Sequence, residues 1–459
     1  MSFNDKYYNY KSFNLNLHIK DGSAIDGVAE EILPKLNVPQ TDRNKKYLVV
    51  LILNVYQNYC MKKNMYTGFS QTRNNYQKKS RYNKNAVSNA IIEINKEMIE
   101  KKYISDGGYF HGREAHKKSY TLRIQALPKL IKIINKHKVD YNKIHARPDT
   151  ECIILKKKQG KKNVQIEYED TEDLKQHRKN LTAYNNLLHK THIDVVGLKE
   201  EGVLIGNSKS PICVNQNNKW TKRIFIKEDN HLLYGRFHGG FWVPMNREWR
   251  SKILINGLDT TEIDYSGMGI NTLYDINNLD IDDKDPYDLT GYYNNNKYSM
   301  KELRPLLKQL LMVMINSKSS VQARNSIQSD VNDVDNDFPD DIDINRLMKA
   351  FQERHKPIKH LFFQSMGNLQ YLLDSSVCAE VINYFTFKNI PVLTVHDSFV
   401  ISIGNGDELR EVMQDAYSVV LKKYKKQMKV KFENKQYERM MAYRNLTLPE
   451  ASNPVEEMN

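Results

Sequence analysis

The sequence predicts an α+β protein, and three patterns support this class. Apolar residues between 83 and 104 recur at spacings of four, three and four, as on one face of a helix. Residues 299–320 form a second, longer pattern of this kind. The segments 391–395 and 399–403 are short runs rich in β-branched residues, bounded by Pro391 and Gly404, as is typical of strands.

The charge of the chain favours a polyanionic partner. The 459 residues, enough for two or three domains, include 69 Lys and Arg against 55 Asp and Glu. The net charge is +14 and the pI about 9.2, which suits nucleic acid most simply. A basic protein with no such partner is the alternative. The 28 Tyr and 15 Phe can stack on bases or fill a core, so they decide nothing alone.

The cysteines and the hydropathy predict a cytoplasmic protein. The four cysteines lie far apart and form no CxxC pair, so neither a zinc site nor a disulfide framework is indicated. No run of eighteen apolar residues occurs, and the first residues do not resemble a signal peptide. We therefore expect no membrane partner.

The N-terminal part predicts a DNA-binding unit. After a polar segment, 1–44, we expect a compact domain over 45–125, with a buried helix at 45–60 and a second helix that Asn85 caps. A Gly-containing turn and an alternating strand follow, and this order resembles a winged helix. That resemblance implies DNA contacts through basic residues near the helix start and on the wing: Arg81, Lys84, Arg113, Lys117 and Lys118. A protein-binding winged helix, or a helical unit with a solvated basic loop, is the alternative.

The rest of the chain divides into three further regions. Residues 126–225 form a basic connector or accessory region, with lysine runs at 156–158 and 161–162. Such runs usually mark a solvated face or a flexible connector, with nucleic-acid contact as a second interpretation. Residues 226–440 contain the motifs, and 441–459 are a disordered tail.

Two aspartates stand where predicted strands end. Asp397 follows His396 at the tip of the predicted hairpin, and Asp264 ends a strand before a helix start. A polar hairpin tip is the ordinary interpretation of His396-Asp397. Two carboxylates on adjacent strands, however, can hold two divalent ions about 3.5–4 Å apart, which clamp the oxygens of a phosphoryl transfer. Mg²⁺ suits such a pair.

The helix between the two aspartates offers phosphate-binding side chains. Arg304, Lys308, Met312 and Asn316 step by four residues and share one face, while leucines form another. Arg binds phosphate as a fork and Lys as a point charge. Taken alone, the segment also fits an ordinary amphipathic helix with snorkelling basic residues.

These three motifs together resemble the palm and fingers of family A DNA polymerases and of phage-type single-subunit RNA polymerases. "DYSGM" at 264–268 is similar to their motif A, "RPLLKQLLMVMIN" at 304–316 to motif B and "VHDSF" at 395–399 to motif C. The resemblance covers roughly residues 232–430. It implies a right-hand polymerase palm with helical fingers and a reduced thumb, preceded by the winged helix.

The resemblance also implies a role for each matching residue. Asp264, Asp397 and the carbonyl of Tyr265 would bind two Mg²⁺, with Mn²⁺ as an alternative, while Arg304 and Lys308 would bind the incoming triphosphate. Lys308 would also assist the leaving pyrophosphate. The other implied contacts are, for the nucleotide, Met312, Asn316 and Gly269, and, for the primer and template, His396, Arg236, Arg247 and Arg250.

Three positions depart from the DNA-polymerase pattern. Gly269 stands where those enzymes have a Glu that blocks a ribose 2′-hydroxyl, and Ser398 replaces the Glu that follows the motif C Asp. Asn316 stands where motif B normally has a Tyr. Because Gly269 removes a steric barrier, we expect ribonucleotides to be accepted.

The expected function is that of a template-directed nucleotidyltransferase, a DNA polymerase with primase activity that replicates a mobile element. Its partners would be a DNA template and primer, nucleoside triphosphates and a small helper protein. A compact single-subunit RNA polymerase is one alternative. A winged-helix regulator or replication initiator with an inactive palm is another.

Overall fold

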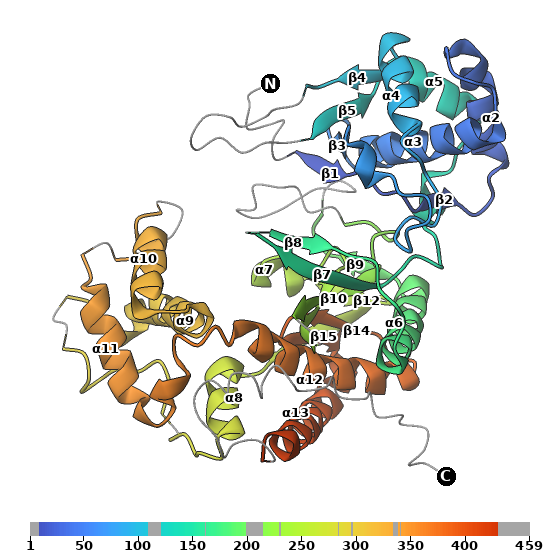
Figure 1. The fold of residues 1–459 in the computed structure, drawn as a ribbon. Helices are drawn as coiled ribbons and strands as arrows, with labels where there is room; N and C mark the ends of the chain where they lie inside the picture. The colour runs from blue at the N-terminus through green and yellow to red at the C-terminus, as the bar shows by residue number, and fades with distance from the viewer. Residues whose placement is uncertain are drawn as a thin grey trace.

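The computed structural model describes residues 9–108, 121–160, 162–198, 214–228, 231–282, 284–294, 297–333, 338–339 and 341–429. Helices and strands both contribute, which confirms the predicted α+β class. Two large apolar cores are present among these residues, one built from residues 17–144 and one from residues 152–421. We refer to the corresponding parts as the N-terminal unit and the C-terminal unit; Figure 1 shows the former in blue to teal above the latter.

The N-terminal unit surrounds a sheet with the order β1-β3-β5-β4. Its strands are β1 (Tyr10–Ser12), β3 (Tyr66–Phe69), β4 (Ile104–Asp106) and β5 (Leu122–Ala126), and β2 (Leu17–Ile19) pairs with β6 (Ile144–Ala146). Its helices are α2 (Ser23–Ile32), α3 (Asp42–Met61), α4 (Ile91–Glu100) and α5 (Pro128–Lys136), with short 3₁₀ turns η1 (Leu33–Lys35), η2 (Arg73–Asn75) and η3 (Tyr141–Lys143).

The two helices expected here are present, but one begins later than predicted. Helix α3 covers the predicted 45–60 and starts at a cap in which the Thr41 side chain accepts from the Asn44 amide. Helix α4 begins at Ile91, so the expectation that Asn85 caps it is wrong. The Asn85 side chain instead donates to the carbonyls of Leu15 and Leu17 and ties the preceding loop to β2.

The C-terminal unit contains two sheets. One has the order β11-β10-β7-β8 and the other β14-β15-β13-β12-β9. The strands of the first are β7 (Ile153–Gln159), β8 (Lys162–Gln165), β10 (Thr221–Glu228) and β11 (His231–Gly239). Those of the second are β9 (Ile193–Val195), β12 (Ile253–Ile255), β13 (Leu258–Asp264), β14 (Val392–Val395) and β15 (Ser398–Ser402).

Helix α12 is the central helix of this unit and has buried residues all round, as expected of a helix enclosed by protein. Figure 1 shows it beneath the sheets, with α9, α10 and α11 projecting to one side. The helices are α6 (Glu172–Lys190), α7 (Arg247–Arg250), α8 (Met268–Ile276), α9 (Met300–Asn316), α10 (Ser320–Val331), α11 (Ile344–Arg354), α12 (Gly367–Phe387) and α13 (Gly406–Lys429), with 3₁₀ turns η4 (Lys356–Leu361) and η5 (Ile403–Asn405).

The core boundaries differ from the expected domain boundaries. Residues between 17 and 36 of the expected separate segment 1–44 contribute to the N-terminal core. The expected connector 126–225 is shared between the units: α5 and β6 pack in the first, β7 and α6 in the second. Lysines 156–158 lie on β7, which pairs with β10 on one side and β8 on the other. The buried residues 153–155 at the start of this strand anchor it in the core. The expected tail 441–459 lies outside the described residues.

Candidate active site

Antiparallel pairing of β13 and β15 brings the two predicted aspartates together. Asp264 is the last residue of β13 and lies opposite Ser398, the first residue of β15. Asp397 immediately precedes Ser398, and its carbonyl lies 3.5 Å from the amide nitrogen of Tyr265. Every residue of β14 and β15 is buried. The core therefore holds both strands in place, and with them the hairpin tip that carries Asp397.

The electrostatic environment of Asp264 suits a cation. Its side chain reaches solvent, yet the surrounding protein raises its pKa to about 6, first by desolvation and then through the negative charges of Asp397 and Glu262. Lys308 acts in the opposite direction and lowers this pKa. Because a divalent ion would relieve the repulsion between the carboxylates, the pair fits the chemistry of a Mg²⁺ site.

The hairpin tip lacks glycine but still needs a left-handed residue. His396 adopts φ +60°, the conformation that tight two-residue hairpin loops require. Its Nδ1 atom is buried and has no hydrogen-bond partner among the described residues. Desolvation, helped by nearby Arg236, lowers the pKa of His396, so the imidazole is neutral near pH 7. The positive φ places the backbone of His396 in the turn beside Asp397, and the expected contact of its side chain with the primer stays a prediction.

The expected phosphate-binding helix is α9, and its two basic residues differ in their contacts. Arg304 donates from Nε to Asp285 at 2.6 Å. That pair is well exposed and costs little to break. Lys308 is exposed, forms no ion pair within the described part of the chain, and lies 5.9 Å from the Tyr287 ring. Lys308 is thus available to a ligand, whereas Arg304 must first exchange Asp285 for it.

The remaining nucleotide-binding candidates lie near α12. Asn316 ends α9 and donates to the Met312 carbonyl. The Gly269 carbonyl accepts from Gln370 Nε2 at 2.6 Å, and a Cβ at position 269 would lie 2.8 Å from that nitrogen. Gln370 of α12 therefore occupies the space beside Gly269.

Arg236 contributes to the site as part of an ion pair that the sequence did not predict. It donates from Nε to Asp374 Oδ2 of α12 at 2.9 Å, and its guanidinium lies 4.1 Å from the Tyr371 ring. Burial raises the pKa of Asp374 to about 6 although Arg236 opposes this. The negative charge of Asp397 also acts on both groups, so the pair lies close to the aspartates.

The two arginines of α7 have different surroundings. Arg247 is exposed. Arg250 is partly buried and binds other groups of the protein. Its Nε and Nη2 donate to the Glu262 carboxylate at 2.7–3.1 Å, and its Nη1 donates to the Met245 carbonyl. Ser398 Oγ donates to the same Glu262 carboxylate at 2.9 Å. Arg250 therefore orients Glu262 in the structure, and a template contact would compete with this ion pair.

Arg81, one of the residues expected to contact DNA, makes several contacts within the protein, and its DNA contact stays a prediction. Its guanidinium stacks 3.6 Å from the Tyr168 ring, donates to the Tyr168 carbonyl and pairs with Asp170 at 3.0 Å. Asp170 belongs to the C-terminal unit, because it directly precedes α6, and it also binds Arg178 of that helix. Arg81 thus joins the two units, and a DNA contact would compete with these ion pairs and hydrogen bonds.

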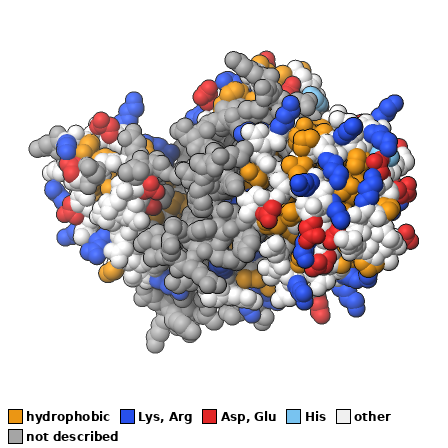
Figure 2. Space-filling model, turned by 90° about the horizontal axis from the view of Figure 1, so that it is seen from above, with side chains coloured by type: hydrophobic (Ala, Val, Ile, Leu, Met, Phe, Trp, Pro, Cys, Tyr) orange, Lys and Arg blue, Asp and Glu red, His pale blue; other side chains and the backbone are white. Residues whose placement is uncertain are grey.

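The other basic residues of the N-terminal unit remain predictions. Lys84 is partly exposed, and its backbone amide donates to Asn16. Arg113, Lys117 and Lys118 lie outside the described residues. Figure 2 shows Lys and Arg side chains spread over one face in small groups, with Asp and Glu between them.

Sequence reasoning missed Glu262, Gln370 and Asp374. Glu262 stands two residues before Asp264, so strand alternation places both on one face, and this period was a usable signal. Gln370 and Asp374 are one helical turn apart on α12, but nothing in the sequence links that turn to the aspartates.

Comparisons with known proteins supply no further identification: no family model, no curated protein and no solved structure matches the chain. No group of three or more His, Cys, Asp or Glu that could hold a metal ion occurs in the described ranges. The helices of those ranges include none that is long and apolar enough to cross a membrane.

Proposed function

We propose that the protein is a template-directed nucleotidyltransferase, a DNA polymerase with primase activity that uses two divalent cations. The observation that carries this proposal is the pairing of β13 with β15, which brings Asp264 and Asp397 to the same end of two neighbouring strands. The resemblance of the surrounding motifs to family A polymerases and phage-type RNA polymerases supports the same activity.

The side chains divide the chemistry between them. Asp264 and Asp397 would hold two Mg²⁺, which activate a 3′-hydroxyl and neutralise the α-phosphate when bound. Lys308 would bind the triphosphate and stabilise the departing pyrophosphate, with Arg304 as a second phosphate contact after it leaves Asp285. Arg236, held by Asp374, would meet the primer terminus. Such catalysis is mostly positioning and charge neutralisation.

The proposed activity also assigns a role to each part of the fold. The sheet β14-β15-β13-β12-β9 with α12 would be a palm, and α9, α10 and α11 would be fingers. In the N-terminal unit, the strand order β3-β5-β4 with α3 and α4 fits a winged helix that contacts DNA. We further propose a cytoplasmic role in replicating a mobile element, with a helper protein, and the charge of +14 suits the nucleic-acid partner.

A compact RNA polymerase is the second candidate, and Gly269 favours it. A glycine there, beside the Gln370 amide rather than an acidic side chain, leaves no carboxylate against a ribose 2′-hydroxyl. Both candidates therefore predict that ribonucleotides are incorporated.

The test is nucleotide incorporation on single-stranded template, with and without primer, using Asp264→Asn and Asp397→Asn. We expect both variants to lose incorporation by about 10³-fold or more while DNA binding in a gel shift stays close to wild type. Asp407→Asn, at the exposed start of α13, is the matched control. A wild type that shifts DNA but incorporates neither nucleotide set with Mg²⁺ or Mn²⁺ would make the protein a regulator.

A further inference from the structure

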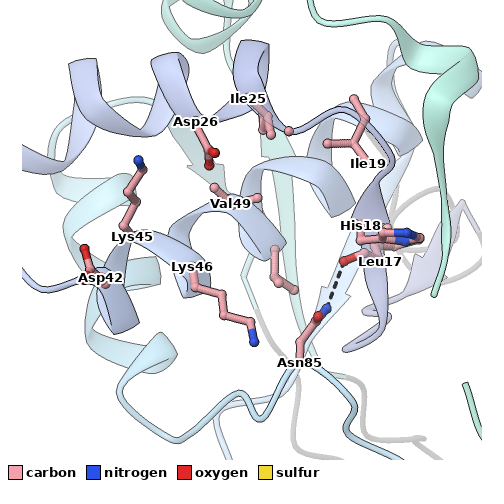
Figure 3. Close-up of a pocket in the computed structure, with 12 residues that line it drawn as sticks. Leu17, His18, Ile19, Ile25, Asp26, Asp42, Lys45, Lys46, Val49 and Asn85 are labelled. Atoms are coloured by element: carbon pink, nitrogen blue, oxygen red, sulfur yellow. Dashed lines mark hydrogen bonds between the residues drawn. The ribbon is translucent and has the colours of Figure 1, made fainter. Parts of the chain in front are cut away.

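A cavity of about 350 Å³ lies in the N-terminal unit, between β2, α2 and α3. Neither Asp264 nor Asp397 lines it. Ile19, Ile25, Val49 and Val50 supply apolar side chains to its lining, and Figure 3 labels the first three. The volume is ample for a nucleobase. None of its lining residues takes part in the proposed chemistry.

The two ends of the cavity differ in charge. Asp26 and Asp42 lie at one end with Lys45, whose ammonium binds Glu30 at 2.7 Å. Lys46 lies at another end, beside Asn85 in Figure 3. Burial and the nearby Arg147 lower the pKa of Lys46, and no acidic group of the described chain pairs with it. An anionic group of a ligand would therefore lie at the Lys46 end.

Asn85 supplies an unused hydrogen-bond acceptor at the cavity. The residue is only 3% exposed, its Nδ2 donates to two backbone carbonyls, and no described residue donates to its Oδ1. This oxygen is open to solvent, because it is not one of the buried side-chain atoms that lack a partner, and a ligand could donate to it in place of water. The position fits an amino or hydroxyl group of a nucleotide.

More cations continue past the Lys46 end. The backbone amides of Lys84 and Arg147 both donate to Asn16, at 2.8 and 2.9 Å, so these two residues are neighbours. Arg147 acts electrostatically on Lys46, and His18 lines the cavity wall. Asp149 is the acidic residue that pairs with Arg147. Lys46 and Lys84 thus carry charges that no described carboxylate pairs with, whereas a phosphate at Arg147 would compete with Asp149.

We propose that the cavity takes one unstacked nucleobase of a single-stranded nucleic acid whose phosphates lie against Lys46, Lys84 and Arg147. Base insertion would use the apolar walls, and Asn85 would accept from the base or sugar. A duplex keeps its bases stacked, so the site would favour single strands. This inference is independent of the catalytic proposal, because it concerns binding alone.

The experiment is fluorescence anisotropy with the full chain and a labelled single-stranded oligonucleotide, without divalent ions. Lys46→Ala should weaken binding about tenfold at low salt and reduce the salt slope by about one. Lys45→Ala, the adjacent lysine that Glu30 already holds, should leave both unchanged. Val49→Trp, which fills the cavity and keeps every charge, should weaken binding about tenfold for the oligonucleotide and leave an abasic strand unaffected.

Several results would overturn the inference. They are equal losses for Lys45→Ala and Lys46→Ala, no loss for Val49→Trp, or equal binding of duplex and single strand. If a mononucleotide at millimolar concentration abolishes binding of the strand, the cavity would instead be a site for a free nucleotide. Ile25→Trp is the second cavity-filling variant should Val49→Trp not fold, and circular dichroism checks both. Intact incorporation by Lys46→Ala on a preannealed primer would separate this site from the aspartates.

Discussion

Asp264 shows at the scale of one residue how repulsion prepares a cation site. Its pKa of about 6 means that the carboxyl group keeps its proton in the folded protein at pH values where an unfolded Asp, with a pKa near 3.8, has lost it. Glu262, which contributes to this shift, is itself held by Arg250 and Ser398. Asp397 and Glu262 thus place negative charge beside Asp264, and a bound cation would relieve the repulsion among the three carboxylates.

A pH prediction follows from this shift. A raised carboxyl pKa lowers stability as the pH rises from about 4 to about 6, because only the unfolded state releases the proton there. Asp264→Asn removes this cost and should melt at a higher temperature than wild type at pH 8 without divalent ions. The difference should vanish near pH 4 and shrink at pH 8 when Mg²⁺ is added. A lower melting temperature for Asp264→Asn at pH 8 would contradict it.

At the scale of the element, helix α9 and the strands β13 to β15 were predictable because their signals are local. The apolar face, the β-branched runs and the flanking Ser299, Gly267 and Pro391 all act within a few residues. Helix α12 was not, because a helix with buried residues on all sides shows no amphipathic period. Its Asp374 meets Arg236 only after two distant segments pack, and no sequence pattern encodes that contact.

The start of α9 allows a test of this element. Ser299 caps the helix in a capping box: its hydroxyl accepts from the Glu302 amide, and the Glu302 carboxylate accepts from the Ser299 amide at 2.7 Å. Ser299→Ala should lower the free energy of unfolding by about 1 kcal/mol in urea denaturation. Ser326→Ala, exposed within α10, should change it little. A loss confined to Ser326→Ala would show that the cap does not hold α9.

At the scale of the whole molecule, the two units meet through a network around Arg81. Glu151, Asp170 and Arg178 of the C-terminal unit surround it, and Tyr82 donates to the Ile166 carbonyl beside them. The sequence analysis assigned Arg81 to DNA because the resemblance to a winged helix places this residue near the helix start. Its acidic partners Glu151 and Asp170 lie 70 and 89 positions further along the chain, and only the folded chain brings them close.

Removal of Arg81 should weaken this contact between the two units. Arg81→Ala leaves Glu151 and Asp170 with one cation fewer, so we expect a loss of about 1–3 kcal/mol in stability. Limited proteolysis should then cut faster between the units, near residues 147–151. Arg73→Ala, exposed on η2, is the control. Unchanged proteolysis of Arg81→Ala, together with weaker DNA binding, would return Arg81 to the role first expected for it.

The central claim is that Asp264 and Asp397 share divalent cations, and Mn²⁺ binding measured by electron paramagnetic resonance tests it most directly. With a DNA primer, template and nonhydrolysable nucleotide, the wild type should bind two Mn²⁺ as a spin-coupled pair. Asp264→Asn and Asp397→Asn should each abolish the coupling. If the wild type binds no more Mn²⁺ than a variant that carries both Asp264→Asn and Asp397→Asn, the account is contradicted.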